Sequence, residues 1–221
     1  MNGKRLTGVC VLLAVGGFGL LRMAPADELR PQVPSIDASN EGGGASSEYA
    51  YVGHNKCKKC HIKEYKSWEG TKMANALESL KPGNAVEAKT KHGLDPAKDY
   101  SAEAKCLKCH TTGHGHEGGY QVPAEGDKAA ERLAKNTAGV GCEACHGPGS
   151  KSLDVFEEIF KSKRTYKVDE LHAVGLTKMG PEACTGCHNE ESPTFEGFDY
   201  EKLLGMTDQM HEKLPLKQRA E

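Results

Sequence analysis

The chain has 221 residues, of which 37% are apolar and 6% are aromatic, and its formal net charge is −2. So few apolar and aromatic side chains predict a thin hydrophobic core, which in other core-poor proteins is supplemented by disulfides or bound metals. The slightly acidic charge argues against a nucleic-acid-binding role, because that role depends on a basic surface.

Residues 1–26 have the organisation of a secretory signal peptide. Two basic residues precede an apolar run from Val9 to Leu21, and Ala24-Pro25-Ala26 offers small residues for cleavage before Asp27. An uncleaved anchor that tethers the protein to the membrane is the alternative, although the run is short for a span and glycines interrupt it. Cleavage removes three basic residues and no acidic ones, so the exported chain is more acidic than the whole.

Residues 27–50 are rich in proline, serine and glycine and contain few apolar side chains. This composition predicts a flexible linker. The folded domain is therefore predicted to comprise residues 51–221.

Four copies of Cys-x-x-Cys-His punctuate this domain: Cys57-Cys60-His61, Cys106-Cys109-His110, Cys142-Cys145-His146 and Cys184-Cys187-His188. This motif is the attachment site of a c-type haem. The two thiols add to the two vinyl groups of the porphyrin, and the histidine that follows lies under the iron as its proximal ligand. The sequence therefore predicts four covalent haem c groups, whose porphyrins supply the apolar volume that the chain lacks.

Two other interpretations of the cysteines are less suitable. In a disulfide scaffold, pairs this close in sequence would cross-link only themselves. In zinc ribbons, Cys-x-x-Cys pairs are usually separated by about 12 to 20 residues and need no following histidine. Here the pairs lie much farther apart and every pair has the histidine. Attachment of haem also agrees with export, because c-type haem is attached outside the cytoplasmic membrane.

The segments between the motifs predict a mainly α, loop-rich domain with no strand longer than a few residues. We expect a helix after His61 that ends near Trp68, and a second one over residues 72–80 that Thr71 caps. Further helices are expected within 84–105 before a turn at Asp95-Pro96, and then over residues 127–135, 168–174 and 200–213. Another is expected from Ser152 onward, with Leu153, Phe156, Ile159 and Phe160 facing inward.

Several linear segments resemble the tetrahaem cytochrome c-554 family. They are Ala76-Leu77-Glu78-Ser79-Leu80-Lys81-Pro82, Leu94-Asp95-Pro96-Ala97-Lys98-Asp99-Tyr100, Gly118-Gly119-Tyr120 and the run from Gly139 to Gly149 around the third motif. The resemblance is strong over residues 51 to 149 and looser over 180 to 214. It implies haems stacked in pairs, the first with the third and the second with the fourth. It also implies a second haem without a protein ligand on its distal face.

The same resemblance implies part of the distal ligand set. His211 matches the family's C-terminal ligand, assigned to the third haem, and Met73 stands where the family has a histidine for the fourth. Methionine ligates haem but also serves as core filler, so both roles stay open for Met73. The family's ligand to the first haem follows the third motif by a few residues, where this chain has no histidine. His172 is the nearest downstream candidate.

The remaining candidates lie around the second haem and outside the motifs. Pro193-Thr194-Phe195 resembles the small and aromatic residues that wall the open haem of the family. His114 and His116 lie in a glycine-rich loop after the second motif and are expected to be exposed, although either could reach an iron. We interpret His54 and His92 as bystanders, with His54 close enough to a motif to reach an iron.

These features favour an exported electron-transfer protein that takes electrons from one redox partner protein and passes them to another in the periplasm. The family's best-known member accepts electrons from hydroxylamine oxidoreductase. An enzyme that reduces nitric oxide, hydroxylamine or nitrite at the open second haem is the alternative, and it would need acid or base groups over the vacant face. A third possibility is a subunit of an extracellular haem filament.

Overall fold

The computed structural model describes residues 48–206, 210–212 and 219–220. All described residues belong to one compact unit. The predicted signal peptide over residues 1–26, and the predicted linker up to residue 47, lie outside the described residues. No helix in the described part of the chain is long and apolar enough to cross a membrane.

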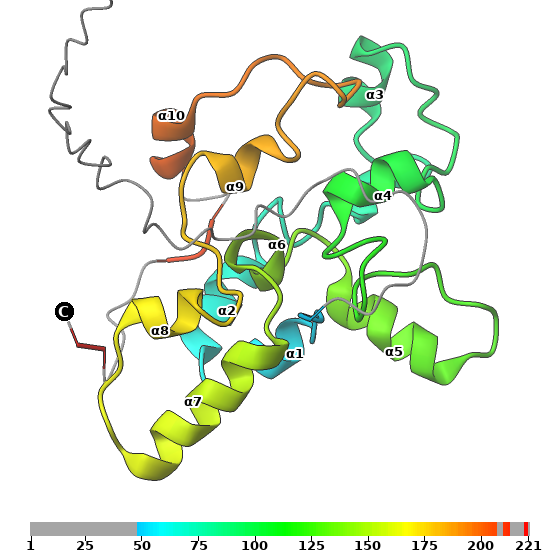
Figure 1. The fold of residues 1–221 in the computed structure, drawn as a ribbon. Coiled ribbons are helices and arrows are strands. Elements are labelled where there is room, and N and C mark those ends of the chain that lie inside the picture. Colours follow the sequence, from blue (N-terminus) through cyan, green and yellow to red (C-terminus); the bar gives the residue numbers. More distant parts are fainter. Residues whose placement is uncertain (1–47, 207–209, 213–218, 221) are drawn as a thin grey trace, which may run out of the picture. The chain divides into compact units, whose positions relative to one another are not determined.

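Ten α-helices and one 3₁₀ helix make up the described regular structure (Figure 1). They are α1 (His54–Cys57), α2 (Ile62–Glu69), η1 (Glu78–Leu80), α3 (Val86–Lys91), α4 (Ala104–His110), α5 (Lys128–Thr137), α6 (Cys142–His146), α7 (Ser150–Ser162), α8 (Val168–His172), α9 (Glu182–Thr185) and α10 (Tyr200–Leu204). β-Pairing among these residues is limited to two isolated bridges, Thr111 with Ala138 and Tyr166 with Arg219. The predicted mainly α, loop-rich fold is confirmed.

Several predicted helices are present with small shifts of their ends. α2 ends at Glu69 before Gly70, as expected. α5 begins after Asp127, whose carboxylate accepts hydrogen bonds from the amides of Ala129 and Ala130 and so caps the helix. α7 begins two residues before Ser152, because Gly149 occupies the N-cap position and the Ser152 hydroxyl donates to its carbonyl oxygen at 3.1 Å.

Three predictions about helices were wrong. Residues 72–77 form turns rather than a helix, because the Thr71 hydroxyl accepts from the Ala74 amide at 3.1 Å and the chain tightens into η1. α10 ends at Leu204 before Gly205, and Met206 and residues 210–212 are not helical. Phe160 does not face inward: its side chain is 52% exposed, whereas Ile159 is 1% exposed.

The apolar core of the described residues consists of two small clusters. One joins residues from the η1, α4 and α5 regions: Leu77, Leu80, Tyr100, Leu107, Tyr120 and Ala134. The other joins α7 to α8 and contains Ile159, Tyr166 and Leu171, with Val155, Phe156 and Leu176 packed against it. Two separate clusters of this size agree with the thin core that the composition predicts.

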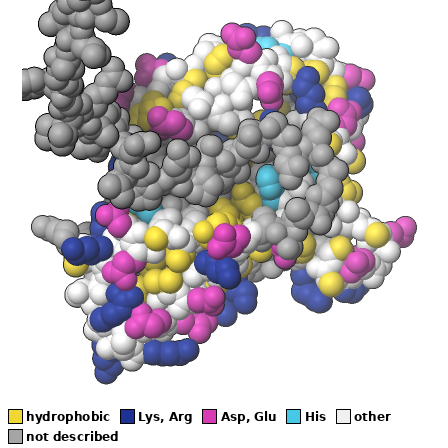
Figure 2. All heavy atoms as spheres, in the orientation of Figure 1, with side chains coloured by type: hydrophobic (Ala, Val, Ile, Leu, Met, Phe, Trp, Pro, Cys, Tyr) yellow, Lys and Arg dark blue, Asp and Glu magenta, His cyan; other side chains and the backbone are white. Residues whose placement is uncertain are grey.

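The surface of α7 carries charges of both signs. In Figure 2, acidic and basic side chains intermingle over this helix, and Lys161 pairs with Glu157 at 3.4 Å. Charges that alternate in this way create no extended field of one sign.

Candidate haem sites

The third motif, on α6, lies at the centre of the four. α6 contacts α1 of the first motif and α9 of the fourth, as Figure 1 shows. The Thr112 hydroxyl, just after the second motif, accepts from the Gly141 amide at 2.8 Å. The His146 carbonyl oxygen accepts from the Thr177 amide at 2.8 Å. Segments that flank the other motifs are therefore bonded directly to α6.

Gly147 permits the close approach of the chain after α8. It has a φ of 80°, and a Cβ built on it would lie 2.6 Å from both the Gly175 carbonyl oxygen and the Thr177 hydroxyl. Only glycine combines this backbone conformation with that proximity. The glycine after His146 therefore serves the junction with residues 175–177.

Glu143, inside the third motif, fastens this helix to the segment before the first motif. Its side chain is 3% exposed, and its carboxylate accepts from the amides of Val52 at 2.9 Å, Gly53 at 2.7 Å and Gly149 at 2.7 Å. Burial raises the pKa of this carboxyl group above its ordinary value, against the opposite influence of the three N–H donors. Sequence reasoning missed Glu143, because its partners Val52 and Gly53 lie about ninety residues away and the motif leaves this position unspecified.

The motif cysteines meet in two pairs from different motifs. The thiols of Cys57 and Cys142 lie close enough to shift each other's pKa, and so do those of Cys109 and Cys187. The interaction with Cys187 lowers the pKa of Cys109 to about 7, and the interaction with Cys57 lowers that of Cys142. The attachment points of the first and third motifs thus lie side by side, as do those of the second and fourth.

His110 has the orientation expected of an axial ligand. Its Nδ1 lies 2.8 Å from the Ala76 carbonyl oxygen and 3.2 Å from the Ser79 hydroxyl. The carbonyl can only accept, so Nδ1 carries the proton and Nε2 keeps its lone pair. This is the arrangement by which proteins orient a histidine toward a metal.

His146 and His211 face one another at a spacing that fits an iron between them. Their ring centres lie 6.1 Å apart with 32° between the planes. An imidazole nitrogen binds a metal at about 2 Å, so two rings on opposite sides of one metal have centres roughly 6 Å apart. Burial, and after it His211 and His61, lower the pKa of His146, which keeps the imidazole in the neutral form that ligates a metal.

The segment around His211 is anchored although it is not helical. The Glu212 amide donates to the Ser67 hydroxyl on α2 at 2.6 Å, and His211 Nδ1 lies 2.8 Å from the Glu212 carbonyl oxygen. As in His110, this bond leaves Nε2 available. The helix predicted over residues 200–213 does not reach His211, but the His211 ring lies opposite His146 all the same.

The chain is similar to known cytochromes of one family. The family model described as cytochrome c554 and c-prime matches residues 56–147. Cytochrome c-554 of Nitrosomonas europaea is 38% identical over 164 residues, which are 71% of this chain and 65% of that protein. The solved structure of reduced cytochrome c554 from the same organism superposes with a TM-score of 0.68 at 31% identity, and the match covers 79% of this chain and 91% of that one.

The chain belongs to the cytochrome c-554 family.

As a tetrahaem cytochrome c-554 relative, it binds four covalent haem c groups. The residues present fit them: the cysteine contacts pair the attachment points, His110 Nε2 is free, and the gap between His146 and His211 accommodates an iron. The matched part spans 65% of the curated relative's length.

For two other ligands predicted for this cytochrome c-554 relative, Met73 and His172, the described structure shows no hydrogen bond, ion pair or ring contact with a motif histidine. Met73 is half-buried in a turn, and its carbonyl oxygen accepts from the Val140 amide at 2.8 Å, just before the third motif. His172 Nδ1 lies 3.6 Å from the Asp169 carboxylate on its own helix. The iron-ligand roles of Met73 and His172 stay predictions.

The two remaining motif histidines contact phenylalanine rings. Phe198 stacks on His188 with ring centres 4.8 Å apart and 28° between the planes. That separation is too small for an iron between the rings, so Phe198 packs against the face of this imidazole. Phe156 lies 6.3 Å from His61 with the planes nearly perpendicular, at 74°.

The two histidines interpreted as bystanders, and the two loop histidines expected to be exposed, have other neighbours in the described structure; His116 is exposed as expected, whereas His114 is half-buried. His92 pairs with Glu196 at 3.2 Å, and His114 Nδ1 lies 3.1 Å from the Tyr120 carbonyl oxygen. His116 approaches the Tyr51 ring at 6.0 Å. His54 contacts Tyr65 and Trp68 in the wall of a cavity of about 450 Å³, and its Nδ1 is buried without a hydrogen-bond partner among the described residues.

Proposed function

We propose that this protein is an exported electron carrier that passes electrons between redox partner proteins in the periplasm. The observation that supports it best is the pairing of cysteines between motifs, Cys57 with Cys142 and Cys109 with Cys187. Porphyrins attached at neighbouring points lie close together, and electron transfer between them needs no substrate pocket. When bound, each haem supplies an iron that alternates between the ferric and ferrous states.

In this proposal the chain's own residues position the haems and tune them. The cysteines of the four motifs hold the porphyrins, and His61, His110, His146 and His188 are the proximal ligands. His211 is the distal ligand opposite His146, and Met73 is the distal ligand of the fourth haem. The Nδ1 bonds of His110 and His211 set the tautomer and the ring orientation, which raises the basicity of Nε2 as a ligand.

Glu143 and Thr112 add rigidity to this arrangement. The Glu143 carboxylate binds the amides before the first motif, and the Thr112 hydroxyl links the loop after the second motif to Gly141. Fixed positions of the attachment points keep the distances between haems constant, as stepwise electron transfer requires. The predicted signal peptide supports export, and redox partner proteins are the donors and acceptors.

A second function, binding or reduction of a small molecule at the second haem, is favoured by two ion pairs. Lys108, inside the second motif, pairs with Glu191 at 3.0 Å, and Lys91 on α3 pairs with Glu196 at 2.6 Å. They bracket Pro193-Thr194-Phe195, because Glu191 precedes this segment and Glu196 follows it. The side chains of Pro193, Thr194 and Phe195 do not ordinarily donate or accept protons at neutral pH. A haem face lined by these residues is therefore suited to binding a small molecule rather than to catalysis.

Rapid mixing of the fully loaded, reduced protein with an oxidised monohaem cytochrome c tests the proposal. We expect about four electrons per chain to be delivered, one from each haem. Nitric oxide, hydroxylamine and nitrite, supplied separately to the reduced protein, should produce no sustained turnover. Turnover of any of these together with failure to reduce the cytochrome would contradict the carrier role and support the enzyme.

A further inference from the structure

We infer that the first haem, attached at Cys57 and Cys60, has no protein ligand opposite His61 and that Phe156 covers its vacant distal face. The inference rests on the proposed function, because it requires a haem at the first motif. It assigns to this chain a second binding site for small neutral ligands of haem iron, in addition to the one at the second haem.

The spacing of the rings carries the argument. Phe156 lies 6.3 Å from His61, and His211 lies 6.1 Å from His146. The distance from Phe156 to His61 is therefore almost the same as the distance from His211 to His146 in the third site. A phenyl ring has no lone pair to give to a metal, so the first iron gains no sixth ligand from this residue.

The position of Phe156 in sequence agrees with this reading. It follows His146 by ten residues, on α7, the helix that comes directly after the third motif. The resemblance to the family placed the distal ligand of the first haem in this part of the chain. The described structure brings α7 to His61 but presents a phenylalanine there.

The orientation of His61 leaves the correct nitrogen for iron. Its Nδ1 lies 3.9 Å from the Glu64 carboxylate, one turn along α2. The carboxylate lies on the Nδ1 side of the ring, beyond hydrogen-bond distance, so Nε2 is the nitrogen that faces away from it.

Packing holds Phe156 in place. Its ring makes an edge contact with Tyr166 at 5.8 Å, and it packs against the cluster of Ile159, Tyr166 and Leu171. Residues of that cluster are 1% to 5% exposed. A side chain fixed by such neighbours is a constant wall rather than a gate that swings away.

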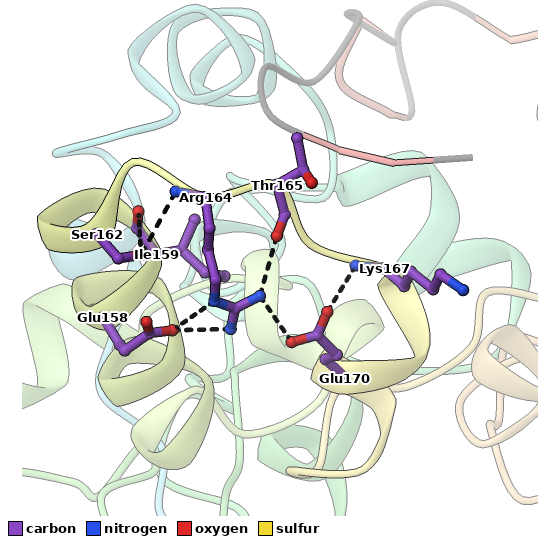
Figure 3. A network of polar contacts seen from close by, with 7 residues as sticks. All are labelled: Glu158, Ile159, Ser162, Arg164, Thr165, Lys167 and Glu170. Atoms are coloured by element: carbon purple, nitrogen blue, oxygen red, sulfur yellow. Dashed lines mark hydrogen bonds and ion pairs between the residues drawn. The ribbon is translucent and has the colours of Figure 1, made fainter.

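A polar clamp fixes the two helices that carry this cluster (Figure 3). The Arg164 guanidinium binds Glu158 of α7 at 2.7 Å and Glu170 of α8 at 2.9 Å, and donates to the Thr165 carbonyl oxygen at 3.0 Å. The Glu170 carboxylate also accepts from the Lys167 amide at 2.9 Å. One side chain thus joins α7 and α8 on the exposed side of the cluster that positions Phe156.

His172 is the competing ligand for the first iron. It is the last residue of α8, and its neighbour Leu171 is 3% exposed in the same cluster, so the backbone beside it is held by the packing that holds Phe156. Its Nδ1 lies near Asp169. Among the described residues, the ring contact with His61 is made by Phe156, whereas the His172 ring contacts Asp169.

The apolar character of Phe156 determines which small molecules can bind at the first haem. An apolar ring offers no hydrogen bond to an anion, so an anion that enters the site loses its hydration without compensation. A neutral diatomic molecule loses little hydration free energy when it enters. The site therefore takes carbon monoxide or nitric oxide in preference to nitrite.

The test compares Phe156→His with wild type in the full, haem-loaded chain. An imidazole at this position can reach the iron, because the Phe156 ring lies from His61 at nearly the distance at which the proposed ligand His211 lies from His146. We expect the reduced variant to bind about one equivalent of carbon monoxide per chain less than wild type. In the ferric state, electron paramagnetic resonance should show that one high-spin haem has become low-spin.

Phe160→His is the matched control. Phe160 lies one turn further along α7 and its side chain is 52% exposed, so the same substitution there should change neither the carbon monoxide count nor the spin states. His172→Ala should also leave the count unchanged. A gain of one equivalent in His172→Ala would show that His172 ligates the first iron and would overturn the inference.

Phe156→Ala keeps the inference falsifiable if the histidine variant does not fold. Removal of the ring should leave the number of equivalents unchanged and accelerate one phase of carbon monoxide binding severalfold. Identical binding kinetics in this variant, or identical counts and spectra in a folded Phe156→His, would overturn the inference. The proposed function requires four haems in every variant, and intact mass spectrometry counts them. A variant with four haems and unchanged carbon monoxide binding contradicts only the inference, whereas a protein with fewer haems contradicts the proposed function.

Discussion

The imidazole rings of His146 and His211 lie 6.1 Å apart, although 65 residues separate them in the chain. Ser67 on α2 and the Glu212 amide hold the approaching segment. Since His211 Nδ1 is engaged by the Glu212 carbonyl oxygen, the free nitrogen of the ring is the one that an iron opposite His146 requires.

His211→Ala should therefore open the third haem. Loss of one axial imidazole converts a six-coordinate low-spin iron to a five-coordinate high-spin one. We expect one additional high-spin ferric signal by electron paramagnetic resonance and a gain of about one carbon monoxide equivalent in the reduced protein. His92→Ala is a suitable control, because that imidazole pairs with Glu196. An unchanged spectrum in His211→Ala would remove His211 from the ligand set.

Met73→His should lower the reduction potential of one haem while that haem stays low-spin. Imidazole donates more strongly than a thioether and so favours the ferric state, and axial ligands shift haem potentials over a range of about 0.8 V. A spectroelectrochemical titration measures the four potentials. Met206→His, at a residue that is 38% exposed, is the control. If Met73 only fills space, the titrations of wild type and Met73→His will superpose.

Glu143→Gln should destabilise the folded protein by about 1–3 kcal/mol, the cost of leaving a buried hydrogen-bonding group unsatisfied. The glutamine carbonyl keeps one acceptor atom, but its NH₂ group faces amides that can only donate. Denaturant unfolding of the haem-loaded protein measures the change. Glu157→Gln, at a side chain that is 71% exposed, should have little effect.

The Glu143 carboxyl also makes stability depend on pH. Burial raises its folded pKa above 4.5, so the folded protein binds more protons than the unfolded chain between these two pKa values. Its contribution to stability is fully present below pH 4.5 and declines as the pH rises through the folded pKa. The difference in the free energy of unfolding between wild type and Glu143→Gln should therefore become smaller as the pH rises. A difference that grows with pH would show that the ionised carboxylate is the favoured form.

Carbon monoxide should bind the second haem in a variant where the first is closed. In Phe156→His we expect about one remaining equivalent per chain, which the second haem binds. His114→Ala should not change this count, since His114 follows the proximal His110 by only four positions and would have to pass around the porphyrin edge to reach the opposite face. The His116→Ala variant tests the neighbouring ring in the same way. A gain in either variant would mean that the loop histidine closes the second haem.

Intact mass spectrometry of the exported protein should give the mass of residues 27–221 plus four haems. The count follows from four attachment motifs, and the N-terminus follows from the predicted cleavage before Asp27. A retained leader would support the anchor interpretation, and fewer than four haems would contradict the attachment assignment.

The sequence by itself determined the cofactor and most of the helices. Cys-x-x-Cys-His is a local motif, because attachment of haem needs two thiols and an imidazole within five consecutive residues. The starts and ends of α2, α5 and α8 likewise follow from glycine, aspartate and apolar spacing within each segment. The helix predicted over residues 72–80 was wrong, since Thr71 suits the start of a turn as well as that of a helix.

Only the tertiary structure decided which residues face each other across the chain. Phe156 and Phe160 lie one turn apart on α7 and look alike to a helical pattern, yet one contacts His61 and the other is exposed. Glu143 finds the Val52 and Gly53 amides, and His211 finds His146 from a segment without helical structure. Contacts of this kind depend on how distant segments pack, and no spacing within one segment encodes them.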